Sequence, residues 1–63
     1  MKEYYEVVGT DKYYCDSLRV CESEAIAYHY FFAMKDAGLK YIEIKHVEET
    51  TAHYRISRSI AFA

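Results

Sequence analysis

The hydrophobic positions of this chain change their period twice, and each change marks a boundary between structural elements. Residues 3–8 combine aromatic and β-branched side chains and stop at Gly9, so they predict a strand followed by a turn. Residues 13–20 predict a second strand, because Leu18 and Val20 alternate with polar neighbours as on a half-buried surface. These two strands are expected to form a hairpin.

A helix is predicted over residues 24–37. Ser23 suits the N-cap position because its hydroxyl can accept a hydrogen bond from the first turn, and Glu24 places negative charge where the helix dipole favours it. The residues that follow are good helix formers and include no proline. Gly38 fits the left-handed position at which many helices end.

After the helix the hydrophobic period returns to two. Residues 41–47 predict a third strand, residues 48–51 a turn, and residues 52–60 a fourth strand. The order is ββαββ, and we expect a single α+β domain over residues 1–63. It is expected to be a two-layer sandwich in which one helix covers one face of a sheet of about four strands. Because the helix connects the second and third strands, these two strands are expected to run parallel.

The predicted helix carries aromatic side chains on two faces. With residues placed about 100° apart, the arc expected to pack on the sheet contains Ile26, Ala27, Tyr30, Phe31, Ala33, Met34 and Ala37. On the opposite arc Tyr28 and Phe32 lie four residues apart, so their rings are expected to stack, with His29 and Lys35 beside them. Such an apolar patch often marks a partner surface. In the alternative, a rotated helix or the N-terminal tyrosines cover these rings within the molecule.

One helix leaves the other face of the sheet open. The residues expected to face the helix are Ile42, Ile44, Tyr54, Ile56 and Ile60. The residues expected to face outward are Tyr41, Glu43, Lys45, Val47, His53, Arg55 and Ser57. Tyr41, Lys45, His53 and Arg55 make an alternative site for single-stranded nucleic acid, in which bases stack on rings and phosphates pair with cations. The nearby Glu43 disfavours this alternative. A solvated face is the preferred interpretation, and pairing of this face with another protein or a second copy of the chain ranks second.

Composition narrows the classes of function. The chain holds eight Tyr and three Phe, which offsets the small core of a domain this short. Charges are mixed and sum to −2, which argues against a polyanion-binding surface. No stretch reaches the roughly 18 apolar residues of a membrane span, and the first residues lack an apolar signal region, so a cytoplasmic protein is expected. The apolar C-terminal residues, among them Phe62, either close the core or meet a partner.

The sequence offers no motif for catalysis, a metal or a cofactor. The spacing of the three histidines and two cysteines fits no compact zinc pattern. Gly9 and Gly38 are too far apart to make a phosphate-binding loop, and a chain of 63 residues leaves little room for a nucleophile, its base and a pocket. Cys15 and Cys21, placed at the two ends of one strand, would lie about 20 Å apart, well beyond disulfide reach, so free thiols are expected. We expect no enzyme activity and no small-molecule substrate.

Two segments carry a resemblance. Val-Cys-Glu-Ser-Glu-Ala-Ile at residues 20–26 and Gly-Leu-Lys-Tyr-Ile-Glu-Ile at residues 38–44 resemble small phage- and prophage-encoded accessory proteins, in which a strand leads into a Ser-Glu-Ala-Ile helix, a glycine and an alternating strand. The resemblance covers about half of the chain and transfers no functional residue. It implies a non-catalytic accessory protein that binds a host protein. A protein partner or a homodimer is therefore the leading expectation, and a nucleic-acid-binding module is the alternative.

Overall fold

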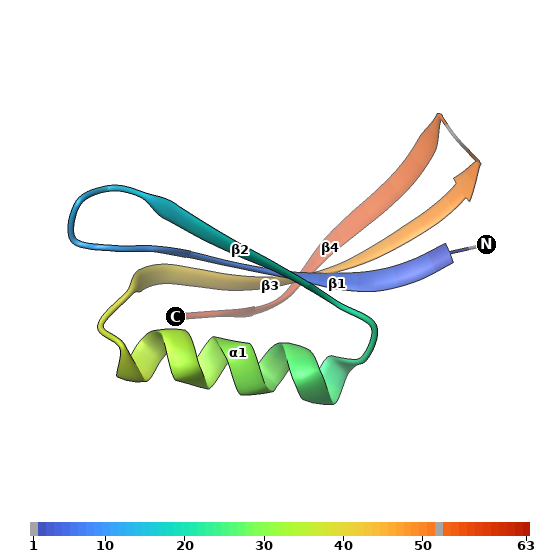
Figure 1. Ribbon diagram of the computed structural model, residues 1–63. Coiled ribbons are helices and arrows are strands. Elements are labelled where there is room, and N and C mark those ends of the chain that lie inside the picture. Colours follow the sequence, from blue (N-terminus) through green and yellow to red (C-terminus); the bar gives the residue numbers. More distant parts are fainter. Residues whose placement is uncertain (1, 52) are drawn as a thin grey trace.

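The computed structural model describes residues 2–51 and 53–63. Its elements are, in order, β1 (Lys2–Thr10), β2 (Asp16–Cys21), α1 (Glu24–Asp36), β3 (Lys40–Thr51) and β4 (Tyr54–Phe62). The predicted α+β class and ββαββ order are confirmed, with one helix packed on a four-stranded sheet (Figure 1). No helix in the described part of the chain has the length and apolar character that crossing a membrane requires.

The sheet is antiparallel, with the strand order β2-β1-β3-β4. β1 lies between β2 and β3 and pairs antiparallel with both, so that Val7 is opposite Arg19 on one side and Ile44 on the other. Because β2 and β3 are each antiparallel to β1, they run parallel to each other, as predicted from the helical connection between them. The edges of the sheet are β2 and β4.

The helix begins and ends close to the residues that the sequence indicates. Ser23 is the N-cap, and its hydroxyl accepts a hydrogen bond from the Ile26 N–H at 3.3 Å. Ala37 is the C-cap, and Gly38 follows with a φ of 87°, a left-handed conformation that glycine adopts without steric cost. The predicted inward arc was too wide, since Ile26, Ala33 and Ala37 are exposed. A single helix resting on a sheet buries only the side chains nearest the contact line.

The core lies between α1 and the sheet. Its buried members are Val7, Cys21, Ala27, Phe31, Met34, Ile42 and Ile44. Gly9 is also buried, because the end of α1 comes close to β1 at this point. A Cβ atom on residue 9 would lie 3.0 Å from Leu39 Cδ2 and 3.1 Å from Met34 Sδ. The close packing of α1 against β1 therefore requires a residue without a side chain at position 9.

The predicted start of the second strand was wrong. β2 begins at Asp16 rather than at residue 13, because the residues before it form a closed loop. One carboxylate oxygen of Asp11 accepts hydrogen bonds from the Tyr13 N–H at 2.8 Å and the Cys15 N–H at 3.0 Å. An aspartate that bonds to backbone groups shortly after itself is a common way to build a turn.

The predicted end of the third strand was also wrong. β3 continues through Thr51, so residues 48–51, expected to form a turn, belong to the strand. Glu48 lies opposite Glu3 of β1, and Glu49 lies opposite Arg55 of β4. Pairing on both sides outweighs the low strand propensity of glutamate. The fourth strand accordingly begins at Tyr54; residue 52, where it was predicted to begin, lies outside the described residues.

The inward face predicted for the fourth strand was wrong at two positions. Tyr54 is 57% exposed and Ile60 is 38% exposed, because α1 contacts β1, β2 and β3 and leaves β4 uncovered. The pairing of β4 with β3 also slips by one residue between Ser59 and Ala61, which takes Ile60 out of the alternation. Ala61 packs against the core instead. Phe62 is 67% exposed, so it does not close the core.

The close approach at Gly9 generates the first prediction. Gly9→Val places a branched side chain against Leu39 and Met34, and overpacking of this kind lowers the free energy of unfolding by about 1–3 kcal/mol. Urea denaturation followed by circular dichroism measures the change. Val8→Ile, which adds bulk to the opposite face of β1, is the control and is expected to leave stability nearly unchanged. Equal stability of Gly9→Val and the wild type would contradict the close packing of Leu39 and Met34 against Gly9.

Candidate functional site

The outward side of α1 presents an aromatic ridge. Phe32 is 55% exposed. The Tyr28 ring stacks beside it with centroids 6.3 Å apart and an interplanar angle of 30°, which confirms the predicted stacking. Phe31, which is buried, meets the Phe32 ring edge-on with centroids 5.4 Å apart. Two neighbours, one of them anchored in the core, therefore restrict the Phe32 ring.

We call Tyr28, His29, Phe32 and Lys35 the helix ridge. The structure brings these four predicted residues together but exposes them unequally. Tyr28 is half-buried and packs against the core, whereas His29 and Lys35 are exposed. The N-terminal tyrosines do not fold over the ridge, because Tyr5 stacks on His46 of β3 with ring centroids 4.8 Å apart. The ridge thus has one exposed apolar anchor among polar neighbours.

The face of the sheet opposite α1 is tied together by its own polar contacts. The Tyr4 hydroxyl donates a hydrogen bond to the Glu49 carboxylate at 2.7 Å, and this bond raises the pKa of Tyr4 above its ordinary value. The Arg55 guanidinium pairs with the Glu6 carboxylate and lies 5.8 Å from the centroid of the Tyr4 ring. Val47, the cross-strand neighbour of Tyr4, is completely buried. The prediction that Val47 faces solvent was therefore wrong, because long side chains close over this part of the face.

The four residues of the nucleic-acid alternative do not form one surface. Lys45 Nζ lies 3.7 Å from Glu43 Oε1, and Arg55 pairs with Glu6, so each cation has an acidic neighbour. His53 lies in the connection between β3 and β4, off the sheet. Tyr41 lies near the start of β3, and Arg55 is paired near the end of that strand. The predicted platform is not assembled.

A cluster of one histidine and two glutamates joins β1 to β3 on the sheet face that carries α1. His46 Nε2 lies 3.2 Å from Glu3 Oε1, and His46 Nδ1 lies 3.8 Å from Glu48 Oε1. Ligand atoms of these three residues lie within 4.8 Å of one another, a geometry that a metal ion can use. Spacing along the sequence did not reveal this group, because it forms across strands. Arg58 lies opposite His46 on the same face and adds positive charge that opposes a cation.

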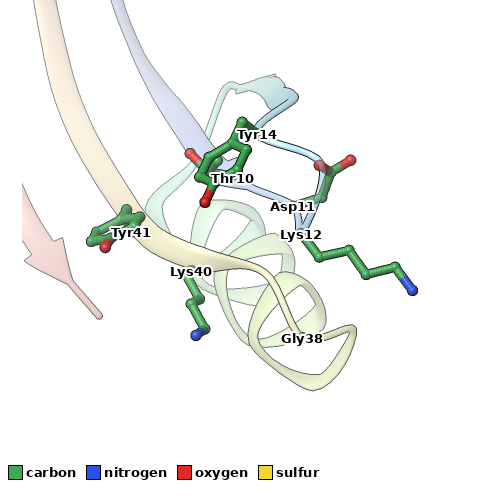
Figure 2. Close-up of a pocket in the computed structure, with 7 residues that line it drawn as sticks. All are labelled: Thr10, Asp11, Lys12, Tyr14, Gly38, Lys40 and Tyr41. Carbon is green, nitrogen blue, oxygen red and sulfur yellow. The ribbon is translucent and has the colours of Figure 1, made fainter.

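At the other end of β1, two exposed tyrosines line a cavity of about 260 Å³. Tyr14 is 90% exposed and Tyr41 is 68% exposed. The remaining lining residues are Thr10, Asp11, Lys12, Gly38 and Lys40. Figure 2 shows Tyr14 on the β1–β2 loop and Tyr41 on β3, with Lys12 and Lys40 extending outward from the rim. We call this cavity the Tyr14–Tyr41 cleft.

Both tyrosines occupy backbone conformations that favour glycine. Tyr14 has a φ of 63° and ends a turn in which its N–H donates to the Asp11 carbonyl at 3.1 Å; a left-handed residue commonly follows such a turn in a hairpin. Tyr41 has a φ of 55° and lies in a β-bulge, where Tyr41 and Ile42 together oppose Gly9. A left-handed conformation costs a residue with a side chain about 1–2 kcal/mol. The exposed rings recover little of this cost through burial.

Sequence reasoning proposed Tyr41 for a different surface and did not propose Tyr14 at all. The available signal was Asp11, whose side chain favours a turn over the strand that was predicted from residue 13. A turn closing on Tyr14 would have shown the ring to be exposed. The pairing of Tyr14 with Tyr41 in one cleft depends on the bulge in β3, which no local pattern indicates.

The two cysteines are free, as predicted, and differ in exposure. Cys15 is exposed at the end of the β1–β2 loop, and Cys21 is buried at the end of β2. Burial raises the pKa of the Cys21 thiol above its ordinary value, which disfavours the reactive thiolate.

Comparison of the chain with protein-family models, with curated proteins and with solved structures finds no match in any of the three. Function is therefore inferred from the surfaces themselves. The helix ridge and the Tyr14–Tyr41 cleft are two places on the described surface where exposed aromatic rings gather.

Thiol alkylation tests the environments of the two cysteines. In the native protein one thiol, Cys15, is expected to react rapidly with iodoacetamide, whereas Cys21 reacts only when the structure opens. Mass spectrometry over a time course distinguishes single from double modification, and both thiols should react in denaturant. Cys15→Ser is expected to remove the rapid phase. A rapid second modification of the native chain would show that Cys21 is not buried.

The left-handed conformation of Tyr41 predicts an unusual response to glycine. Tyr41→Gly relieves a strain of about 1–2 kcal/mol and loses about 0.5–1 kcal/mol through the flexibility of glycine, so the free energy of unfolding should stay equal or rise slightly. Tyr54→Gly, at an exposed strand tyrosine without positive φ, is the matched control and should lower it by about 1 kcal/mol. Chemical denaturation of both variants makes the comparison. Equal destabilisation of the two would contradict the strain at Tyr41.

Proposed function

We propose that this chain is a non-catalytic protein-binding domain and that the helix ridge is its contact surface. The observation that supports this proposal is Phe32, a large apolar side chain that is 55% exposed although the buried Phe31 and the half-buried Tyr28 hold its ring in place. A side chain fixed before binding loses little conformational freedom when it enters a partner's pocket. Aromatic residues of this kind supply much of the binding free energy in many interfaces.

The surroundings of Phe32 suit an interface. His29, Lys35 and Asp36 are exposed polar residues on the same side of the helix, so the apolar anchor has a polar rim. Interfaces commonly combine a small apolar centre with such a rim. A helix with an apolar centre and a polar rim on one side can dock that side into an apolar groove of its partner. The partner can be another protein or a second copy of this chain.

The proposal extends to origin and location. A cytoplasmic location is supported by the two free thiols, since reducing compartments keep cysteines unpaired. The origin proposed is a phage or prophage, which rests on the resemblance of residues 20–26 and residues 38–44 alone.

Alanine substitution at Phe32 tests the proposed function. Sedimentation velocity over a range of concentrations first determines whether the chain associates with itself. Affinity capture from the host cytosol then identifies other partners, and each is titrated in purified form. Phe32→Ala is expected to weaken the interaction by about 2 kcal/mol or more, the loss typical of an anchor residue, while stability changes little because the ring is largely exposed.

Ile26→Ala is the matched control for this experiment. Ile26 is 49% exposed on the same helix but lies outside the ridge, so its removal should leave binding intact. Two results would refute the proposal: binding that survives Phe32→Ala, or an equal loss in both variants.

A further inference from the structure

The Tyr14–Tyr41 cleft combines features that the fold itself does not require. Both rings are more than half exposed, at 90% and 68%, and both residues hold backbone conformations in which glycine would be less strained. Strained residues that converge on one cavity are characteristic of functional sites. Packing within the protein therefore does not explain why these two positions are tyrosine. A ligand that stacks on the two rings would explain it.

The charge around the cleft is positive, although the whole chain has a net charge of −2. Lys12 and Lys40 line the cleft, and Lys35 lines an adjoining cavity that shares Lys40 and Tyr41. The ion pairs found among the described residues use none of these three lysines. Asp11 is the acidic residue in the lining, and one of its oxygens already accepts two backbone hydrogen bonds. The cleft thus favours an anion.

The size and lining of the cleft restrict the ligand further. A cavity of about 260 Å³ lies just below the range of sites for drug-sized molecules, so it accepts one planar ring system rather than a large ligand. Exposed tyrosine faces bind planar rings by stacking, and flexible lysines pair with phosphate as point charges. A nucleotide unit has both parts.

We propose that the Tyr14–Tyr41 cleft binds a nucleotide unit, with the base stacked on the tyrosine rings and the phosphate attracted by the positive charge of the lysines at the rim. This site is separate from the helix ridge and does not depend on the proposed protein-binding function. The chain contains no Asn or Gln, the residues that commonly read base edges. Recognition therefore rests on stacking and charge, with weak preference among bases. A free mononucleotide and a single-stranded nucleic acid both present this chemistry.

A titration of ¹⁵N-labelled protein, followed by amide chemical shifts in low salt, tests the site. The two ligands are a mononucleotide, uridine monophosphate, and a short oligothymidylate. The largest shifts are expected at Tyr14, Tyr41 and the flanking lysines. Similar affinities for the two ligands indicate a site for free nucleotides, whereas binding of the oligonucleotide alone indicates a single-strand site. Absence of shifts at the cleft with both ligands, or shifts confined to the face with Lys45 and Arg55, would overturn the proposal.

Variants separate a role in binding from a role in folding. Tyr14→Gly and Tyr41→Gly relieve backbone strain, so both proteins should stay folded while affinity falls at least about fivefold, the lower limit for loss of one stacked base. Tyr14→Phe and Tyr41→Phe keep the rings and should retain binding. Tyr54→Gly removes an exposed tyrosine far from the cleft and should bind normally; a comparable loss there would count against the site. Phe32→Ala should also bind normally, so failure of one proposal is distinguishable from failure of the other.

Discussion

One short helix must cover a sheet that is too long for it, and this mismatch governs the structure. α1 has 13 residues and is roughly 20 Å long, whereas β3 has 12 residues and is roughly twice that length. Figure 1 shows the β3–β4 hairpin and the start of β1 extending beyond the helix, and the molecule measures 36 × 23 × 14 Å. Half of the sheet therefore has no second layer. Apolar burial stabilises the covered half, and cross-strand contacts hold the other half together.

In the uncovered half, polar and aromatic side chains on both faces contact one another across the strands. On one face Tyr5 stacks on His46, which also contacts two carboxylates. On the other face the Tyr4–Glu49 hydrogen bond and the Arg55–Glu6 ion pair surround the buried Val47. These contacts engage the cations that a nucleic-acid platform on the sheet would need. Exposed aromatic rings that these contacts leave available include Phe32 on the outer side of α1 and Tyr14 on the β1–β2 loop.

The sequence was sufficient to predict what depends on local pattern. Ser23 and Gly38 marked the helix ends, and the period-two segments gave the ββαββ order. Two failures come from long-range pairing: the glutamates of β3 are strand because β1 and β4 flank them, and Ile60 leaves the core because β4 slips in register. The wrong start of β2 has a local cause, since Asp11 closes a turn before it. For the site, the Tyr28–Phe32 stacking followed from four-residue spacing. The Tyr14–Tyr41 cleft required a bulge that only the pairing of β1 with β3 reveals.

The register slip at Ile60 also bears on how readily β4 can pair with a strand from another molecule. β4 is an uncovered edge with exposed apolar side chains at Tyr54, Ile60 and Phe62, and a flat edge of this kind can recruit strands from other molecules. The extra residue interrupts the regular ladder and increases local twist, which hinders a foreign strand from pairing in register past it. Arg58, on the same edge strand, adds positive charge that disfavours pairing with a second copy of β4. A single inserted residue thus makes this apolar edge a less regular template for a strand from another molecule.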